Sequence, residues 1–529
     1  MPSRRANFLV FVTDQQRADH LGCYGNTVVR TPHIDALASR GVVFDRFYVA
    51  SPVCMPNRAA LATGRMPSVA GVRMNGVPLS LSAATHVDAL RGAGWRTALI
   101  GKCHLQNMTD SPPAWKVTPA AGAADNEAVR DLRVGPAYEQ ESMARWRDPA
   151  HQVSLPYYGF DHVELCLEHG DEVGGHYARW LAARGVRQSA VTGPDRPGAT
   201  RGIVAPQAWR TGLREEDYPS AFVRDRTIAW LDRHAASAAG EPFYVQCSFP
   251  DPHHPFTPPG RWFDAYRAAD VALPESFAAS GPRDHPIKTA LHAELASGRR
   301  DAARSSRAIA VTADEARQAI ALTYGSIACI DAMVGDVLRA LDRLGLARDT
   351  VVVFLSDHGD FMGDHGLMFK GPLHFRSLVR MPFIWSDPAL PPGRRSQLAS
   401  AIDYAPTVLA RAGVAPYHGM QGMDLAATMA ASGEGRTRDA LLIEEEGHRA
   451  VPGLAGVPRV RTLLTERWRL TLYAGQPRGE LLDLREDPFE IANRFGDGDL
   501  ASVRGELAWA LADLQARLAD DCPRPSRMA

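Results

Sequence analysis

The sequence predicts an α/β protein, with a large and mostly parallel sheet flanked by helices and a small C-terminal α+β domain. Short, continuous apolar runs alternate with helical patterns along most of the 529 residues, as expected for a sheet covered on both faces. Hydrophobic residues make up 45% and charged residues 22% of the chain, which excludes global disorder. Residues 436–529 instead show a hairpin pattern followed by a leucine-rich helix.

Four apolar runs of strand length mark the predicted parallel sheet. In chain order they are Phe8–Thr13, Thr97–Ile100, Phe243–Phe249 and Thr350–Leu355. A helix is predicted after the first run, with Thr31 as N-cap, Pro32 as its first residue and Gly41 beyond its end. Another helix buries one face directly before the fourth run, and its apolar residues are Ile327, Ile330, Val334, Val337, Leu338 and Leu341.

The C-terminal residues predict a different kind of structure. Val460–Thr465 and Trp468–Tyr473 are separated by only two residues, a spacing that indicates an antiparallel hairpin. Glu480–Leu484 is a candidate for a further strand, and leucines then recur at helical spacing from residue 500 to residue 518. We therefore expect a hairpin with a terminal helix packed on it.

The expected domain boundary lies in Ala430–Thr437, a stretch that contains two glycines. It divides the chain into a large α/β domain, residues 1–435, and a C-terminal α+β domain, residues 436–529. The region from about 107 to 220 is rich in Arg, Pro and Gly and predicts no particular element. Long irregular insertions in α/β enzymes often shape the substrate site, so this region is expected to matter for specificity.

Composition and charge exclude several classes of function. Lys and Arg number 59 against 60 Asp and Glu, a net charge of −1, whereas nucleic-acid binders need a basic excess. Seven cysteines include no C-x-x-C pair, which argues against a disulfide scaffold or a thiolate zinc site. The apolar run Phe8–Val12 is too short for a signal peptide, and no apolar stretch approaches the roughly 18 residues of a membrane span. We expect a cytoplasmic protein that binds neither nucleic acid nor membranes.

Polar side chains follow all four predicted strands. They are Asp14 and Gln15, then Lys102 and His104, then Asp251, His253 and His254, and finally Asp357 and His358. A single Asp after a strand is more often a helix N-cap, and a single His pair is more often structural. Ligands of open α/β sheets, however, bind at the carboxyl ends of the strands, where these four sets would meet. Their oxygen and nitrogen atoms indicate a divalent cation and a metal-assisted hydrolytic site.

The segment Ser51–Arg65 contains the most specific pattern of the chain. Pro56 suits the first turn of a helix, which places Cys54 at the helix N-terminus, where the dipole favours an anion. Arg58 lies one turn further on. A buried structural cysteine is the alternative interpretation. The spacing from Cys54 to Arg58 is too short for the phosphate loop of thiol phosphatases.

The string C-x-P-x-R-x-x-x-x-x-G-R, from Cys54 to Arg65, resembles the signature of the type I sulfatases in the alkaline phosphatase superfamily. Further elements resemble the same family in the same order: Thr13–Asp19, Thr31–Leu37, Gly101–His104, Ser356–Asp360 and Leu481–Glu490. The resemblance spans nearly the whole chain and is weakest at about 107–220. It implies an alkaline phosphatase-like fold and hydrolysis of aryl or alkyl sulfate esters, close to the arylsulfatase, choline sulfatase and phosphonate monoester hydrolase branch.

The resemblance also implies a modified nucleophile and a metal. In that family the motif cysteine, here Cys54, is oxidised to formylglycine, whose hydrated form is a geminal diol. One hydroxyl of a diol can attack sulfur and the other can then expel sulfate, whereas a thiol or alcohol would be left as a stable ester. Asp14, Gln15, Asp357 and His358 are the implied protein ligands of one divalent ion, together with the nucleophile at Cys54. Gln15 and His358 replace the Asp and Asn of many sulfatases, so Ca²⁺ and Mn²⁺ are both open.

The resemblance also implies a role for each of the remaining site residues. Arg58 would hold the diol and its charge, and Lys102 and Lys370 would neutralise the sulfate oxygens. His104 would assist deprotonation of the diol during sulfate release. His253 would bind the sulfate or protonate the leaving oxygen, with its neighbour His254 as the alternative in register.

Three functions remain after this comparison of motifs. A sulfuric-ester hydrolase is favoured by Lys102 and His104, because phosphonate hydrolases tend to carry uncharged hydroxyl residues there. A phosphonate monoester or phosphodiester hydrolase is the alternative, since Gln15 and His358 fit it, and one enzyme can have both activities. A silent anion-binding scaffold would lack a core position, and none is missing.

The partners expected from the resemblance are a small sulfate, phosphonate or phosphodiester substrate, a formylglycine-generating or equivalent maturation enzyme, and further copies of the chain in a homo-oligomer. The C-x-P-x-R string needed for maturation is complete, although Asn57 replaces the more usual serine.

Overall fold

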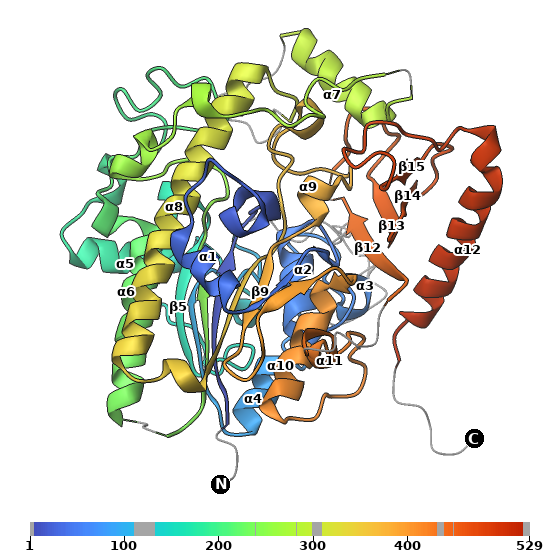
Figure 1. Cartoon of the computed structure of the whole chain (residues 1–529). Coiled ribbons are helices and arrows are strands. Elements are labelled where there is room, and N and C mark those ends of the chain that lie inside the picture. Colours follow the sequence, from blue (N-terminus) through green and yellow to red (C-terminus); the bar gives the residue numbers. More distant parts are fainter. Residues whose placement is uncertain are drawn as a thin grey trace, which may run out of the picture.

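A nine-stranded sheet forms the centre of the molecule, with strand order β10-β2-β9-β8-β1-β7-β4-β5-β6 (Figure 1). The computed structural model describes residues 5–109, 133–237, 240–281, 283–298, 309–430, 438–447 and 449–521. The sheet is mixed but mostly parallel, and helices flank it, so the predicted fold class is confirmed.

The four predicted strands lie side by side at the middle of this sheet. They are β1 (Asn7–Thr13), β4 (Arg96–Gly101), β7 (Phe243–Ser248) and β8 (Thr350–Ser356). β1 pairs in parallel with both β8 and β7, and β7 pairs in parallel with β4. Every residue of β1 and β8 is buried, which explains why the runs are continuously apolar rather than alternating. The carboxyl ends of all four strands therefore meet at one edge.

Shorter strands extend the sheet on both sides. They are β2 (Val42–Phe44), β5 (His162–Leu167), β6 (Gly174–Gly175), β9 (Phe383–Ser386) and β10 (Gly393–Arg395). β9 runs antiparallel to both β8 and β2, and β6 runs antiparallel to β5. A separate two-stranded sheet pairs β3 (Phe47–Tyr48) with β11 (Ala399–Ser400). The short length of these strands leaves too little periodicity for a prediction from sequence.

Helices cover both faces of the large sheet. One hydrophobic cluster joins Leu9 and Phe11 of β1 to α1 (Pro32–Ser39), α5 (His176–Ala183), α6 (Pro219–Ser237) and α8 (Ala313–Arg343). The opposite cluster joins Phe8, Val10 and Val12 to α2 (Cys54–Thr63), α4 (His86–Gly92) and α10 (Tyr404–Ala412). Successive β1 residues thus alternate between two cores. The other helices of this part are α3 (Pro67–Ala70), α7 (Pro286–Ala296), α9 (Arg376–Val379) and α11 (Ala426–Met429).

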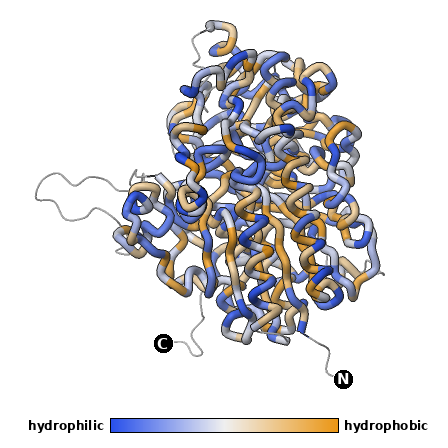
Figure 2. The backbone as a smooth tube through the Cα atoms, turned by 90° about the vertical axis from the view of Figure 1, so that its left-hand side faces the viewer, coloured by the Kyte–Doolittle hydropathy of each residue, from blue (hydrophilic) through white to orange (hydrophobic). Residues whose placement is uncertain are grey.

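The long helix α8 contains the apolar residues that were predicted to share one face. Within the described residues it is the one helix with the length and apolarity of a membrane span, and 89% of its most apolar window is buried in the protein. Figure 2 shows hydrophobic stretches along the interior segments and hydrophilic ones in many outer loops. α8 therefore serves as a core helix, packed against α1 and α6.

The C-terminal region forms a four-stranded antiparallel sheet with a helix packed on it. The order is β12-β13-β14-β15, and the bounds are β12 (Ala440–Glu446), β13 (Arg459–Thr465), β14 (Trp468–Tyr473), β15 (Glu480–Asp483) and α12 (Ala501–Arg517). The predicted hairpin and terminal helix are present, whereas β12 was not predicted. The proposed boundary after residue 435 lies within 431–437, outside the described residues, so the division into residues 1–435 and 436–529 stays a prediction.

Candidate active site

Cys54 is the first residue of α2 and lies at the carboxyl edge of the sheet. Its side chain is buried, with Sγ 3.1 Å from His358 Nε2 and 3.4 Å from Lys370 Nζ. Burial opposes ionisation of the thiol, but the charges of Lys370 and His358 outweigh it and lower the pKa of Cys54. The structure thus places the predicted nucleophile at a helix N-terminus beside two groups that stabilise an anion.

Four potential metal ligands converge at this point. One ligand atom each from Asp14, Cys54, Asp357 and His358 lies within 4.8 Å of the others, and all four residues are buried. Asp14 Oδ1 is buried without a hydrogen-bond partner in the described part of the chain. His358 Nδ1 donates to the Gly359 carbonyl at 2.8 Å, so its Nε2 lone pair faces the cluster. This donor set fits one divalent cation.

Gln15 lies at the edge of the same cluster. Its Oε1 accepts a hydrogen bond from Lys370 Nζ at 2.7 Å, and its Nε2 donates to the Asp360 carboxylate and to His254 Nδ1. The backbone of Gln15 has a positive φ of 60°, and its N–H donates to Asp357 Oδ1 at 2.9 Å. Gln15 is therefore brought to the site as predicted, with its amide held by three side chains.

Arg58 binds both acidic members of the cluster. Its Nε donates to Asp357 Oδ2 at 2.8 Å, and one terminal nitrogen donates to Asp14 Oδ2 at 3.1 Å. The other terminal nitrogen donates to the Lys102 carbonyl and to Ser248 Oγ. Burial disfavours its charge, but the two carboxylates outweigh burial and raise the pKa of Arg58. Arg58 thus orients the two carboxylates through its hydrogen bonds. These hydrogen bonds do not reach Cys54, although the resemblance implied that Arg58 would hold the diol at that position.

Two ammonium groups lie at the cluster. Lys102 is fully buried, and its Nζ contacts both the Asp14 carboxylate and His169 Nε2. Lys370 Nζ contacts Gln15, Cys54 and His358, as well as His253 Nε2 at 3.1 Å. Burial alone would lower the pKa of Lys370, but Cys54 and then Asp14 raise it. Both positions therefore offer positive charge to a bound anion.

Three imidazole rings stack against one another beside these lysines. The ring centroids of His169 and His253 are 3.5 Å apart, and those of His253 and His254 are 4.0 Å apart. His253 Nδ1 donates to the His254 carbonyl, so Nε2 of His253 faces Lys370. Burial first, then the neighbouring histidines and Lys370, holds the pKa of His253 well below its usual range. His253 thus faces the cluster directly, whereas His254 supports Gln15.

His104 is held in place by a carboxylate that the sequence did not reveal. The Glu141 carboxylate accepts the backbone N–H groups of His104 at 2.7 Å and of Leu105 and Gln106 at 3.1 Å each, and the Tyr157 hydroxyl at 2.8 Å. His104 has a positive φ of 58°, and its buried Nδ1 has no hydrogen-bond partner among the described residues. Burial and the charge of Lys102 keep the pKa of His104 well below its usual value.

Four residues of the site were missed by sequence reasoning. Glu141 and His169 fall in the unassigned region and belong to no recognisable motif. Asp360 is part of the Ser356–Asp360 string, and that position was the available signal. Asn57 joins two strand ends, because its amide accepts from the Ala50 N–H at 2.8 Å and donates to the Asp357 carbonyl.

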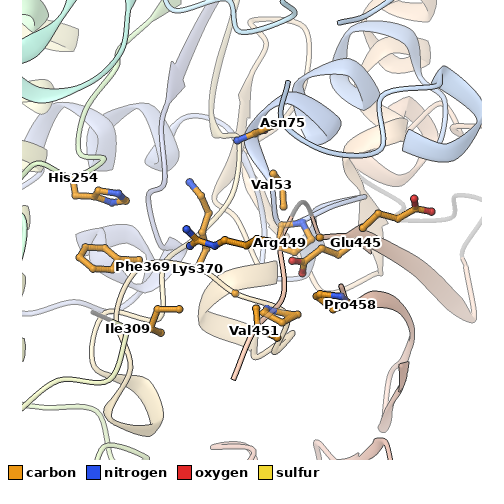
Figure 3. Close-up of a pocket in the computed structure, with 15 residues that line it drawn as sticks. Val53, Asn75, His254, Ile309, Phe369, Lys370, Glu445, Arg449, Val451 and Pro458 are labelled. Atoms are coloured by element: carbon orange, nitrogen blue, oxygen red, sulfur yellow. The ribbon is translucent and has the colours of Figure 1, made fainter. Parts of the chain in front are cut away.

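A cavity of about 210 Å³ opens next to this cluster (Figure 3). Its lining includes Lys370 and His254 of the site, together with Val53 and Phe369. Gly447, Arg449, Val451 and Pro458, in the loop that follows β12, complete this part of the lining. The C-terminal sheet thus reaches the site through this loop.

Comparison with known proteins gives matches along the whole chain. The family model described as Sulfatase matches residues 6–414, and the model described as N-sulphoglucosamine sulphohydrolase, C-terminal, matches residues 363–517. An arylsulfatase of Clostridium perfringens is 25% identical over 500 residues, covering 92% of this chain and 90% of the relative. A choline-sulfatase of Rhizobium meliloti is 24% identical over 509 residues, covering 93% and 83%.

A solved structure agrees with the sequence matches. The phosphonate monoester hydrolase of Agrobacterium radiobacter superposes with a TM-score of 0.75 at 26% identity, over 98% of this chain and 96% of that chain. The family model covers most of the chain, from the first strand past α10, and includes every residue of the cluster. The chain therefore belongs to the sulfatase family, within the alkaline phosphatase superfamily.

Proposed function

We propose that this sulfatase hydrolyses aryl or alkyl sulfate esters with a formylglycine made from Cys54 and one divalent metal ion. Membership of the family establishes a sulfuric-ester hydrolase. The observation that carries the proposal is the position of Cys54, buried at the start of α2 with its sulfur 3.1 Å from His358 and 3.4 Å from Lys370. Few structural roles would require a cysteine between an imidazole and an ammonium group, close to the carboxylates of Asp14 and Asp357.

The formylglycine and the metal ion would each supply one kind of chemistry. A formylglycine at position 54 would supply a geminal diol: one hydroxyl oxygen would bond to sulfur as the bond from sulfur to the leaving oxygen breaks, and the other hydroxyl would lose its proton as the bond from carbon to the sulfate oxygen breaks and the aldehyde forms again. Asp14, Asp357 and His358, with Gln15 beside them, would hold a divalent ion, whose positive charge would lower the pKa of the nucleophile. Arg58 keeps the two carboxylates oriented for that ion through its hydrogen bonds.

The other side chains bind charge and move protons. Lys370 and Lys102 neutralise the oxygens of the sulfate, and the full burial of Lys102 strengthens its attraction. His253 presents Nε2 beside Lys370 and binds a sulfate oxygen or protonates the leaving oxygen. His104 is neutral and its Nδ1 has no partner in the described residues, so it can accept the proton of the second hydroxyl during sulfate release.

Manganese is the ion that we propose ahead of calcium. Calcium binds almost only oxygen ligands, whereas this cluster includes the imidazole nitrogen of His358. We expect Mn²⁺ in the purified enzyme by elemental analysis, and recovery of activity with Mn²⁺ after chelation. Calcium as the sole ion that restores activity would contradict this choice.

Phosphonate monoesters and phosphodiesters are the second class of substrate. The structural similarity to the phosphonate monoester hydrolase and the pair Gln15 and His358 favour it. Lys102 and His104 favour sulfates. A panel of aryl sulfates and phenyl phosphonates separates the two, and we expect the higher kcat/KM for the sulfates. The opposite order would make the phosphonate hydrolase the main activity.

The direct test of the nucleophile is mass spectrometry of the peptide that contains Cys54. Active enzyme should show the mass of an aldehyde in place of the thiol at this position. An intact Cys54 thiol in fully active enzyme would refute the mechanism. Because Cys54 and Arg58 are buried, with 1% and 5% exposure, we expect the maturation enzyme to act on the C-x-P-x-R string before the chain folds.

Assembly and location complete the proposal. We propose a homo-oligomer, as expected from the family resemblance, located in the cytoplasm. Light scattering on purified enzyme and fractionation of the native cells test the two points. A monomer, or enzyme found outside the cytoplasm, would contradict them.

A further inference from the structure

We propose that His169 is a positioning residue, which holds the ammonium group of Lys102 in the orientation that binds the sulfate of the substrate. This inference rests on the proposed hydrolysis of sulfate esters, in which Lys102 neutralises the sulfate oxygens. It gives a role to a histidine that belongs to no motif of the sequence. The position of His169 in the fold, its contact with Lys102 and its stacking on His253 support it in turn.

The end of a fifth strand brings His169 to the site. β5 pairs in parallel with β4, with Leu165 opposite Gly101, so the residues that follow the two strands lie at the same edge of the sheet. Lys102 follows β4 directly, and His169 lies two positions beyond the last residue of β5. The side chain of His169 is only 15% exposed. The fold thus brings an imidazole and an ammonium group together from neighbouring strands.

The contact between these two groups fixes the ammonium group. Lys102 Nζ contacts His169 Nε2 and the Asp14 carboxylate. Because an ammonium group has three N–H donors and no acceptor, His169 Nε2 accepts one N–H and the Asp14 carboxylate accepts another. The hydrogen of the imidazole is then on Nδ1, which faces the Glu168 carboxylate at 3.7 Å. The described residues give Lys102 Nζ no third polar partner, so its third N–H is available to a sulfate oxygen.

The ring of His169 also lies against His253. The two imidazole planes are inclined by 15°, with centroids 3.5 Å apart. His253 has further supports, because its Nδ1 donates to the His254 carbonyl and its ring stacks on that of His254. The hydrogen bond to Lys102 is therefore the contact of His169 on which the site depends most. Because both nitrogens of His169 face protein groups, the residue acts through Lys102 and does not bind the sulfate itself.

The same histidine also belongs to a second group of potential metal ligands, but two lysines oppose a cation there. Ligand atoms of Asp14, His169 and His253 lie within 4.8 Å of one another. Lys102 Nζ contacts the first two of these residues, and Lys370 Nζ lies 3.1 Å from His253 Nε2. Two ammonium groups repel a further cation at so short a range. The geometry therefore favours an anion at this point.

The test separates the nitrogen of His169 from its ring. His169→Phe keeps a ring that can stack on His253 but has no acceptor for Lys102, whereas the amide oxygen of His169→Gln can accept from Lys102. In His169→Phe we expect kcat/KM for an aryl sulfate to fall about tenfold or more, the effect of one hydrogen bond to a charged group. The dissociation constant of inorganic sulfate, measured by calorimetry, should rise by a similar factor. His169→Gln should stay within about threefold of wild type in both quantities.

Two controls show that the fold and the metal site are intact. His162→Phe changes a histidine at the start of β5, whose side chain is 35% exposed, and should keep wild-type kinetics. The far-UV spectrum and the metal content by elemental analysis should be the same in both His169 variants as in the wild type. A merely structural role of His169 would not be restored by glutamine, which has no ring to fill the space.

Three outcomes would overturn the positioning role. They are wild-type kinetics in His169→Phe, no recovery in His169→Gln, and a second metal ion in the wild type that is lost from His169→Phe. The last of these would make His169 a metal ligand. Failure of the proposed function is recognised separately, because the wild-type enzyme would then hydrolyse no sulfate ester, whereas the dissociation constants of inorganic sulfate would still report on Lys102.

Discussion

The inner cluster and the outer wall of the active site are built in opposite ways. The inner cluster comprises Asp14, Cys54, Arg58, Lys102, Asp357, His358 and Lys370, and the outer wall comprises Val53, Phe369, Val451 and Pro458. Inner contacts join charged and polar side chains, such as Arg58 and Asp357, which are 299 residues apart. The outer wall consists of apolar side chains.

This difference predicts that the inner cluster determines the chemical step and that the outer wall determines the choice of substrate. Most of the inner side chains are buried, and their opposite charges lie in contact, so removal of one charge leaves its partner unpaired in a dry site. The outer side chains contribute contact area, which changes in small steps. Variants of the inner cluster should therefore abolish turnover, and variants of the outer wall should change its selectivity.

Cys54→Ala is the variant with the largest expected effect. Loss of the nucleophile should lower kcat by roughly 10⁴-fold or more, as for other enzymes that act through a covalent intermediate. Because alanine suits a helix start that is buried, the far-UV spectrum and the Tm should change little. Cys23→Ala, at a half-buried cysteine outside the cluster, is the control and should keep full activity. Turnover retained in Cys54→Ala would exclude the assignment.

Arg58→Lys tests the link between Asp14 and Asp357, the two carboxylates that we propose as metal ligands. A lysine keeps the charge but cannot bind Asp14 and Asp357 together, so both carboxylates lose their orientation. We expect kcat/KM to fall by about 10²-fold and the metal to bind about 10- to 100-fold more weakly. Arg65→Lys, at the other arginine of the motif, pairs with Asp520 at the surface and should stay within about twofold of wild type. Unchanged metal affinity in Arg58→Lys would contradict the positioning role.

Glu141→Gln tests a residue that acts on the site through the backbone. The neutral amide accepts the N–H groups of His104, Leu105 and Gln106 more weakly, so the loop that carries His104 should loosen. A loss of about 1–3 kcal/mol from the weaker hydrogen bonds corresponds to about a fivefold or larger fall in kcat, with metal content unchanged. Glu139→Gln, at an exposed carboxylate nearby, is the control. A fall in metal content would place Glu141 among the groups that organise the metal instead.

Val451→Ala tests the outer wall. Truncation removes two methyl groups from the cavity lining, at about 0.8 kcal/mol for each buried carbon, and Val451 is only half-buried. We expect KM for an aryl sulfate to rise about three- to tenfold with kcat nearly constant. A fall in kcat without a change in KM would mean that this wall acts on the chemical step.

The inner cluster could be predicted from the sequence because its parts follow recognisable strands. Asp14 and Asp357 come directly after runs whose continuous apolar character shows that they are buried on both faces. Parallel strands bring their carboxyl ends to one edge, so the convergence follows from the fold class. Cys54 added a helix start with a specific motif.

The outer wall and the rest of the cavity lining could not be predicted because the positions and the ion pairs of their residues depend on tertiary contacts. Glu444–Glu446 looks like a solvated acidic stretch, yet it forms the end of β12, where Arg461 pairs with Glu444 and Glu446 and His374 contacts the Glu445 carboxylate. Glu141 and His169 are single residues in an irregular region. Their importance arises only when the fold brings them to His104 and Lys102.

The smallest expected effect is a change in stability, and it concerns a residue that lies beneath the inner cluster. His86 of α4 is buried under α2, with Nδ1 donating to the Ala62 carbonyl and Nε2 accepting from the Tyr244 hydroxyl, both at 3.0 Å. Burial lowers the pKa of His86 to about 4. Between that value and the ordinary pKa near 6.5, the unfolded chain binds a proton that the folded chain does not. Stability should therefore fall as the pH drops from about 6.5 to about 4.

His86→Gln removes the group that takes up this proton, so the stability of the variant should fall less than that of the wild type as the pH drops. The glutamine can replace one of the two hydrogen bonds, so at pH 7.5 we expect a loss of about 1–2 kcal/mol in stability. The difference from wild type should shrink at pH 5, because the wild type then bears the cost of a neutral buried histidine. Thermal unfolding at the two pH values measures this, and His418→Gln, at an exposed histidine, should match wild type at both. A difference in stability that widens toward pH 5 would show that His86 is charged in the folded protein. The residues beneath the cluster would then include a buried charge, as the cluster itself does.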